Sequence, residues 1–166
     1  PGKNTPFVAL NYSQTELQAV GLKSQVKRND EIIAQRRKNA EYLTKRFAEN
    51  DAIIPQLLDT DDIKPSYHLY QLQIDPAKAG GDIQVLKKKL EEKGVTNIPH
   101  FGLLYRFDII AKLGYDVDAI AESCPNAEEV FYKRFTHLPI YALSDDQFEY
   151  MADAILESVA EMQAGK

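Results

Sequence analysis

The sequence predicts an α+β fold, in which a small, mostly antiparallel sheet is covered by helices and preceded by a long N-terminal helix. Apolar residues recur near a 3.5-residue period between residues 14 and 49, which is a helical pattern. Residues 67–74 alternate as a half-buried strand does. Asp82 and Ser144 each precede a further helical pattern and can cap its N-terminus. Strands interspersed with helices of this kind typically form two layers around one core.

The long helix is expected to follow an extended lead-in at residues 1–12. Ser13-Gln14-Thr15-Glu16 fits a capping box, in which a Ser oxygen and a Glu carboxylate satisfy free backbone donors. A helix from there to Glu49 would be about 50 Å long at 1.5 Å per residue, so we expect a bend near Arg28-Asn29-Asp30. Its apolar side exceeds what a small domain can cover, which suggests that it packs against protein outside this chain.

The later elements follow from local signals. Residues 50–65 are expected to be an irregular acidic connection. Residues 67–74 form the clearest strand, with His68, Tyr70, Leu72 and Ile74 on one face. Further expected elements are a helix through 83–90 that ends at Gly94, a short strand at 95–98 and a helical turn at 107–113. A helix from Pro125 and a strand at 135–140 follow. The capping box 144–147 then opens a final helix, which carries on one side Phe148, Met151, Ile155, Val159 and Met162.

The size of the chain suits one domain, and its composition is ordinary for a soluble globular protein. The chain has 166 residues, of which 44% are hydrophobic and 27% charged, and we divide it into 1–49 (lead-in and long helix) and 50–166 (small α+β domain). A net charge of −5 argues against a nucleic-acid partner. The basic runs 36–38 and 87–89 are expected to be solvated helix faces. No apolar run reaches the roughly 18 residues that a membrane span needs, so no membrane partner is expected.

The segment Asn97–Phe107 is the best candidate for contact with a ligand. It sets His100, Phe101 and Tyr105, with a proline and a glycine among them, between a strand pattern and a helix pattern. Functional side chains often lie on loops that rigid elements hold in place. The composition of this segment therefore favours binding over core packing.

A metal site is not expected. His68, His100 and His137 are too far apart in sequence to match the spacing of zinc ligands. His68 suits a hydrogen-bonded histidine of the strand and a site residue equally well, whereas His137 is expected to be structural. Cys124 is the single cysteine, so it forms no internal disulfide, fits a reducing cytoplasm, and is expected to be structural.

Asn11-Tyr12-Ser13 is a second candidate site. An Asn amide just before a helix start can donate two N–H bonds to an anion, and free backbone donors lie nearby. This combination favours phosphate. The alternative is that Asn11 only satisfies a turn, and the residues alone leave both interpretations open.

Several segments together carry a family resemblance. They are 11–19 (Asn-Tyr, then Glu-Leu-Gln-Ala), the basic helix 36–43, Ser66-Tyr67-His68-Leu69-Tyr70, the loop 100–105, Cys124-Pro125-Asn126-Ala127-Glu128, and Leu138-Pro139-Ile140-Tyr141. In this order they resemble the C-terminal portion of nucleotide-sugar aminotransferases of the DegT/DnrJ/StrS type. Departures include Ser13, where the family usually has Arg, and Leu103, where it commonly has Pro.

The resemblance implies a fold, a cofactor and partners. The chain would be the small C-terminal domain of the aspartate-aminotransferase fold (fold type I), in a cytoplasmic, homodimeric enzyme of nucleotide-sugar and polysaccharide biosynthesis. Pyridoxal 5'-phosphate would be the cofactor, and the enzyme would move an amino group from an amino acid to a keto-sugar nucleotide. Asn11 would bind the cofactor phosphate of the partner subunit. The substrate side would be formed by Tyr12, His68, His100, Phe101 and Tyr105.

The same resemblance implies that this chain alone is inactive. The family's Schiff-base lysine lies several dozen residues before the Asn-Tyr motif, in a large domain that this chain does not include, and neither Lys3 nor Lys23 matches its position. We therefore expect a fragment without the catalytic lysine. Two alternatives remain: the related pyridoxal phosphate-dependent sugar dehydratases, and a free-standing, non-enzymatic dimerisation domain.

Overall fold

The computed structural model describes residues 13–56, 59–97, 102–140 and 143–165. Its sheet is antiparallel, of order β1-β2-β3, and consists of β1 (Ile53–Ile54), β2 (Tyr70–Ile74) and β3 (Phe135–Leu138). The helical elements are α1 (Glu16–Lys27), α2 (Asn29–Phe47), α3 (Pro76–Ala79), α4 (Ile83–Glu92), α5 (Asp108–Lys112), α6 (Val117–Ser123), α7 (Pro125–Glu129) and α8 (Asp145–Gln163), with a 3-10 turn η1 (Leu104–Arg106) and a π-helical turn η2 (Val130–Arg134). The predicted α+β class with a small antiparallel sheet is confirmed.

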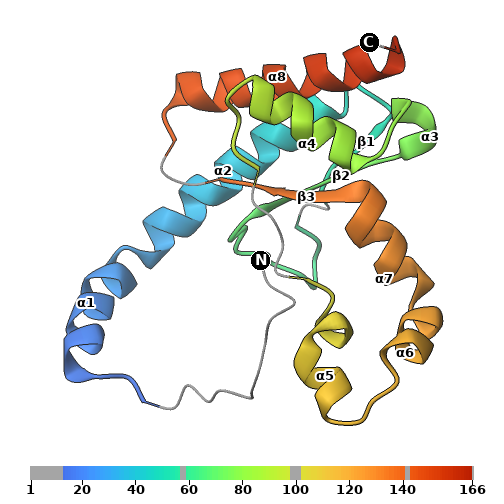
Figure 1. Ribbon diagram of the computed structural model, residues 1–166. Coiled ribbons are helices and arrows are strands. Elements are labelled where there is room, and N and C mark those ends of the chain that lie inside the picture. Colours follow the sequence, from blue (N-terminus) through green and yellow to red (C-terminus); the bar gives the residue numbers. More distant parts are fainter. Residues whose placement is uncertain (1–12, 57–58, 98–101, 141–142, 166) are drawn as a thin grey trace.

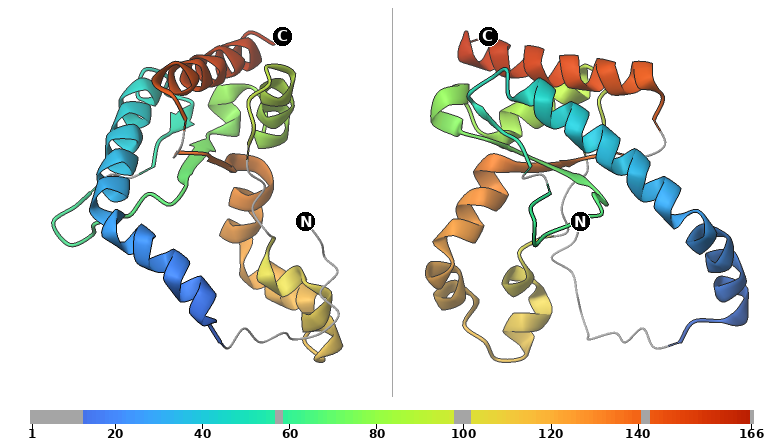
Figure 2. Two further views of the ribbon diagram at one scale, coloured as in Figure 1. Left: turned by 90° about the vertical axis from the view of Figure 1, so that its left-hand side faces the viewer. Right: turned by 180° about the vertical axis from the view of Figure 1, so that it is seen from behind.

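Three helices and one face of the sheet enclose the core. Figures 1 and 2 show α2, α4 and α8 together on one side of the sheet, while α1 and the α5–α7 segment project away from it. Tyr70 pairs with Leu138 and Leu72 with Thr136, so these four side chains share one face. All four are buried. The core therefore lies between this face and the three helices, and α8 supplies much of it (Phe148, Met151, Ala152, Ala154, Ile155, Ser158, Val159 and Met162).

The first helical region is divided as expected but begins later than expected. Arg28 separates α1 from α2 with a φ of −103°, which confirms the predicted bend. The prediction that Ser13 caps the helix is wrong: Thr15 is the N-cap, and it forms the capping box with Gln18. Thr15 and Gln18 have the same three-residue spacing as the expected pair, so the pattern fits both positions and the structure starts the helix at the second.

α1 buries none of its side chains in this chain. Leu17 is 83% exposed and Val20 is 68% exposed, and Leu22 and Val26 are exposed as well. At about 100° per residue, Leu17 and Val20 lie on one side of the helix and Leu22 and Val26 on the opposite side. α1 thus carries apolar side chains on two faces rather than along the single side that the sequence pattern suggested.

Other differences concern the strands. β1 lies within the expected irregular connection, where Ile53 pairs with Ile74. The strand expected at 67–74 begins only at Tyr70, because Tyr67 adopts a φ of +47°, outside the extended region. Val95–Asn97, expected in a strand, form none. α3 and α6 were not predicted from the sequence.

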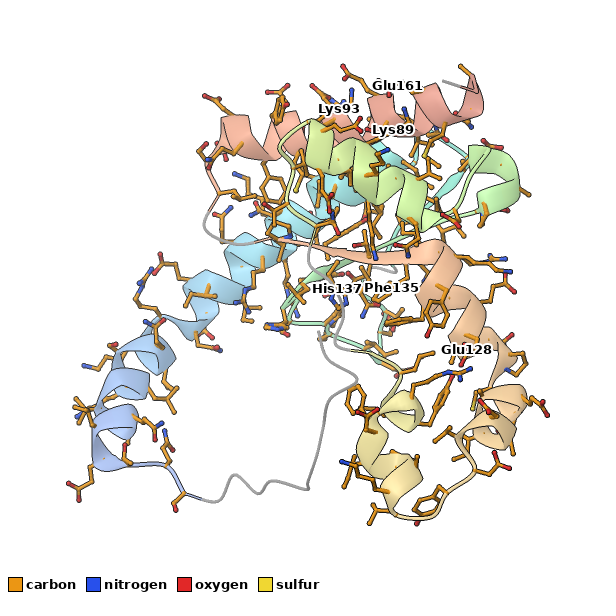
Figure 3. The ribbon with its side chains drawn as sticks, in the orientation of Figure 1. Lys89, Lys93, Glu128, Phe135, His137 and Glu161 are labelled. Carbon is orange, nitrogen blue, oxygen red and sulfur yellow. The ribbon has the colours of Figure 1, made fainter. Side chains whose placement is uncertain are left out.

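Carboxylates and lysines join α4 to α8. Lys89 binds Glu161 at 2.8 Å, and Lys93 binds Glu161 at 3.0 Å and Glu157 at 3.1 Å. Figure 3 shows Lys89, Lys93 and Glu161 where the two helices face each other. The expectation that the basic runs form solvated faces is therefore wrong for Lys89, whose side chain is only 17% exposed. It is also wrong for Arg37, which is half-buried.

Among the residues that the structure describes, no helix has both the length and the apolar character that a membrane span requires.

Candidate functional site

The residues singled out in the sequence divide into two groups. Asn11, Tyr12, His100 and Phe101 lie outside the described residues, so their placement remains a prediction. His68 and Tyr105 are described. His68 is exposed on a bend before β2 and does not share the buried face of Tyr70, Leu72 and Ile74, which corrects the expected alternation. The strand period does not extend back to His68 because β2 starts two residues later.

Tyr105 belongs to a hydrogen-bonded group that we call the Glu128 cluster, formed by Tyr105, Arg106, Asp118 and Glu128. The Tyr105 hydroxyl donates to Glu128 Oε1 at 3.0 Å. Arg106 donates to the same oxygen from Nε at 3.0 Å, and its Nη2 lies 2.9 Å from it. The Nη1 of Arg106 donates to Asp118 at 3.3 Å. Figure 3 shows Glu128 directed toward the segment that includes η1.

Local sequence explains why these groups meet. α7 begins at Pro125, whose fixed φ suits a first helical position, and this places Glu128 in the first turn. Asp116 caps α6 by accepting from the backbone of Asp118 and Ala119, and so fixes the start of the helix that carries Asp118. η1 is closed by a bond from the Arg106 N–H to the Leu103 carbonyl. Two helix starts and one tight turn therefore position the four side chains.

Glycine is required where the chain enters η1. Gly102 has a φ of +151°, and a Cβ atom there would lie 2.9 Å from the Phe107 ring. L-residues rarely adopt such a φ. Phe107 therefore packs directly against the backbone before Tyr105, which holds the corner compact.

The electrostatics of the cluster are set by its two carboxylates. Burial raises the pKa of Tyr105, and the hydrogen bond and charge of Glu128 raise it further. The bond to Glu128 also raises the pKa of Arg106, which stays a cation. One guanidinium against two carboxylates leaves the cluster with a formal charge of −1. Tyr105 thus keeps its proton at neutral pH and shares it with Glu128.

A second polar group fixes the connection that leads to His68. Asp59 lies 3.2 Å from Arg37 Nη1 on α2, and it accepts a bond of 3.4 Å from the Tyr67 hydroxyl. Arg37 Nη2 donates to the Pro65 carbonyl. Burial raises the pKa of Tyr67, and the charge of Asp59 adds to the effect. This anchoring was not predicted from the sequence. The available signal was the pair Arg36-Arg37 on α2 followed by Asp59 in the next connection.

A pocket is lined by residues of α8 and of the segment that follows α4. It has a volume of about 430 Å³, and Val95, Pro139 and Leu143 contribute its apolar wall. Tyr150 and Asp146 of α8 supply its polar groups. Neither His68 nor Tyr105 is among its described lining residues, and the other predicted site residues lie outside the described part of the chain.

The described residues do not by themselves hold the pyridoxal phosphate that the resemblance implies. Such a site needs an amine for the aldehyde and donors for the phosphate. Lys38 lines a pocket of about 290 Å³, but Asp145 and Glu149 line it too, and their carboxylates would repel a phosphate. Burial lowers the pKa of Lys87, yet Lys87 lines neither described pocket. Neither Lys38 nor Lys87 thus joins an amine to a phosphate site.

The remaining histidine and cysteine have packing environments. His137 is 5% exposed in β3, and its ring meets the Phe135 ring edge-on at 4.7 Å (Figure 3). Cys124 is half-buried beside the Ser123 hydroxyl, at 3.7 Å. Within the described parts of the chain, no group of His, Cys, Asp and Glu side chains has an arrangement that could hold a metal ion.

Comparison with known proteins places the chain among aminotransferases. The model of the DegT/DnrJ/EryC1/StrS aminotransferase family matches residues 2–156. Among curated proteins, the chain is similar to the 3-amino-5-hydroxybenzoate synthase of Amycolatopsis mediterranei (strain S699), with 27% identity over 154 residues. That match covers 90% of this chain and 39% of the relative.

Solved structures share the fold. A sugar aminotransferase of Streptococcus pneumoniae, in its PLP form, superimposes with a TM-score of 0.75 at 21% identity over 90% of this chain and 37% of that chain. Helicobacter pylori PseC, an aminotransferase involved in the biosynthesis of pseudoaminic acid, gives 0.72 at 18% identity over 93% of this chain and 40% of that chain. The chain thus spans about two fifths of the length of the relatives that it matches.

Proposed function

The chain belongs to the DegT/DnrJ/EryC1/StrS aminotransferase family, and from this premise we propose that it forms the C-terminal part of an enzyme that transfers an amino group from an amino acid to a keto-sugar nucleotide. Enzymes of the family depend on pyridoxal phosphate, and the Streptococcus pneumoniae neighbour is solved in both PLP and PMP forms. The observation that carries the proposal is the match over residues 2–156 combined with coverage of only about two fifths of each relative.

The reactive lysine is assigned to polypeptide outside this chain. Two observations support this assignment: the relatives are more than twice as long, and the pocket that Lys38 lines also carries the carboxylates of Asp145 and Glu149. The cofactor would supply an electron sink for breaking bonds at the amino-bearing carbon. This chain would contribute binding and orientation, with residues 50–166 as the small domain and 1–49 as the lead-in and helix that join it to the rest.

α1 supports a role between two bodies of protein. A helix with apolar side chains on opposite faces loses free energy in water unless both faces are covered. Leu17 and Val20 on one side, and Leu22 and Val26 on the other, are exposed here. We assign one face to the large domain of the same subunit and the other to a second subunit of a homodimer.

Substrate contacts are assigned to the segments on either side of the Glu128 cluster. Asn11 would donate to the cofactor phosphate, and Tyr12, His68, His100, Phe101 and Tyr105 would contact the sugar nucleotide. The support among described residues is that Tyr105 is held rigidly by Glu128, and that His68 is exposed next to a connection fixed by Asp59. Side chains held in this way lose less conformational entropy when they bind a ligand.

The activity is tested with the longest polypeptide encoded by the reading frame that contains this chain. That polypeptide, with pyridoxal phosphate, L-glutamate and a 4-keto-6-deoxyhexose nucleotide, should release 2-oxoglutarate together with an amino sugar detected by mass spectrometry. A product that has lost a hydroxyl group without gaining nitrogen would identify the dehydratase alternative. A reading frame that starts directly before Pro1 would instead support the free-standing domain.

The assignment of the lysine has its own test. The 166-residue chain, mixed with pyridoxal phosphate and reduced with borohydride, should carry no stoichiometric adduct on any one lysine. Mass spectrometry of a tryptic digest measures this. A single fully modified lysine, such as Lys87, whose modification disappears in Lys87→Arg, would overturn the assignment.

A further inference from the structure

We propose that Glu128 fixes the direction of the Tyr105 hydroxyl, so that Tyr105 accepts a hydrogen bond from a hydroxyl or amino group of the substrate and the Glu128 cluster does not bind phosphate. This inference rests on the proposed function, in which Tyr105 lies on the substrate side. It assigns Glu128 as a positioning residue, a role that sequence comparison alone does not reveal.

The direction of the hydrogen bond follows from the groups present. An ionised carboxylate has acceptors only, and Glu128 forms an ion pair with Arg106 at 2.9 Å. The proton between Tyr105 and Glu128 therefore belongs to Tyr105, at an oxygen separation of 3.0 Å. With its one proton committed, the phenol has only lone pairs left to offer a ligand. A ligand atom facing Tyr105 must then be a donor.

Tyr105 has no proton to donate to an anion, and Arg106 does not offer a free donor fork in its place. Its Nε and Nη2 face Glu128, at 3.0 and 2.9 Å, and its Nη1 faces Asp118 at 3.3 Å. Every nitrogen of the guanidinium thus has a carboxylate partner, and the fork that would bind a phosphate is already occupied. The formal charge of −1 on the cluster further disfavours a diphosphate.

The cluster is also partly shielded from solvent, which strengthens its hydrogen bonds. Glu128 has a side-chain exposure of 23% and Arg106 of 32%, so both are partly removed from water. Leu104, which precedes Tyr105 in η1, is 70% exposed, so this turn also presents an apolar side chain to solvent. The ring hydroxyls of a sugar are donors that a fixed acceptor can bind. The diphosphate of a nucleotide sugar would then bind elsewhere in the enzyme.

The same chemistry accommodates two substrate classes within the family. A hexose ring offers several hydroxyl donors. The compound 3-amino-5-hydroxybenzoate, which appears in the name of one relative, has an amino group and a hydroxyl group. Both would meet Tyr105 through a donor. The cluster therefore selects a hydrogen-bond donor over an acceptor at the position that contacts Tyr105.

The first experiment tests the positioning without any substrate. In the full-length enzyme with ¹³C-labelled tyrosine, the Tyr105 signal is assigned with Tyr105→Phe and titrated with pH. Glu128→Gln should lower the Tyr105 pKa only in part, because burial still raises it. Glu122→Gln makes the same chemical change on an exposed glutamate of α6 and should leave the pKa unchanged. An unchanged Tyr105 pKa in a folded Glu128→Gln enzyme would overturn the positioning role.

The second experiment tests the polarity of the contact with UDP, dTDP, UDP-glucose, dTDP-glucose and 3-amino-5-hydroxybenzoate as probes. A hexose nucleotide should move the Tyr105 signal, whereas the sugar-free nucleotide should bind without moving it. Tyr105→Phe should weaken hexose binding roughly three- to tenfold, the range for one hydrogen bond, and leave nucleotide affinity unchanged. Glu128→Ala, which removes the acceptor of the Tyr105 proton, should reproduce that selective loss, and Glu122→Ala should not.

The outcomes separate the two proposals. If UDP or dTDP moves the Tyr105 signal as strongly as the hexose forms, the polarity inference is overturned while the nucleotide-sugar function stands. If no nucleotide binds and 3-amino-5-hydroxybenzoate moves the signal, the substrate proposed above is wrong and the polarity inference is supported. If no probe moves the Tyr105 signal of the folded enzyme, the substrate role of Tyr105 is overturned. The pKa titration of the first experiment then tests separately whether Glu128 positions the Tyr105 hydroxyl.

Discussion

The hydroxyl groups of Thr44 and Tyr70 lie 2.8 Å apart and join α2 to β2 in the core. Tyr70 is fully buried, and burial raises its pKa. Tyr70→Phe keeps the ring but leaves Thr44 without this partner, so we expect the free energy of unfolding to fall by about 1–3 kcal/mol. Urea denaturation measures the change. Tyr115→Phe, at a residue that is 60% exposed, is the matched control and should change stability by less than about 0.5 kcal/mol. Equal effects of the two substitutions would contradict the prediction.

Leu72→Ala should destabilise the chain through a cavity. Leu72 is fully buried in β2, opposite Thr136 and under the helices. Large-to-small changes at such positions cost about 2–5 kcal/mol. The matched change Leu113→Ala removes the same atoms from a residue that is 58% exposed and should be close to neutral. Chemical denaturation measures the free energy of unfolding of both variants. A loss below about 1 kcal/mol for Leu72→Ala would contradict the prediction and mean that the core can collapse around the missing side chain.

The α4–α8 ion pairs predict a pH dependence of stability. Hydrogen bonds from Lys89 and Lys93 lower the pKa of Glu161 below its ordinary value of 4.5. A carboxyl group whose pKa is lower in the folded state stabilises the fold above the unfolded pKa and loses that effect as the pH falls through the folded pKa. The difference in urea midpoint between wild type and Glu161→Gln should therefore be constant near neutrality and shrink below pH 4.5.

Glu122→Gln controls for the loss of one carboxylate in that titration, because Glu122 is exposed on α6. The plot of its urea midpoint against pH should stay parallel to that of wild type down to acid pH. If the Glu161→Gln curve is also parallel to wild type, the contacts of Glu161 with the two lysines do not contribute to folding.

The exposed faces of α1 predict self-association. Leu17→Lys together with Val20→Lys should weaken any dimer by tenfold or more, because burying each such side chain contributes on the order of 1.5–3 kcal/mol. Stability should change little, since both residues are exposed in the single chain. Sedimentation at micromolar concentration measures the association, with Val85→Lys on α4 as a control at an exposed valine. A wild-type chain that is strictly monomeric under these conditions would contradict the interface role of α1.

Helices with complete local signals could be predicted closely from the sequence. The Ser144 and Gln147 capping box starts α8, and Asp82 starts α4, as expected. β1 could not be predicted, because a two-residue strand has no period and exists only through its pairing with Ile74. Val95–Asn97 look like a strand but have no described strand to pair with. Local patterns thus sufficed for α4 and α8, whereas tertiary pairing determined the sheet.

The candidate site was only partly accessible to sequence reasoning. Tyr105 was singled out from the composition of its loop, but its bond to Glu128 spans 23 positions. Nothing in the local pattern of either residue indicates that pairing. The need of a half-buried Arg106 for an acidic partner was the one available clue. Asn11, Tyr12, His100 and Phe101 rest on the family resemblance and remain predictions.

The order of elements along the chain has a consequence for biosynthesis. β2 pairs with β3, and the core is covered by α8, which follows all three described strands in the sequence. A polypeptide still on the ribosome therefore displays the unpaired edge of β2 until β3 is translated, and an uncovered apolar surface until α8 is translated. Such intermediates aggregate readily. Prematurely terminated products that lack α8 should accordingly depend on chaperones or be degraded, even though most of the strands and helices have already been synthesised.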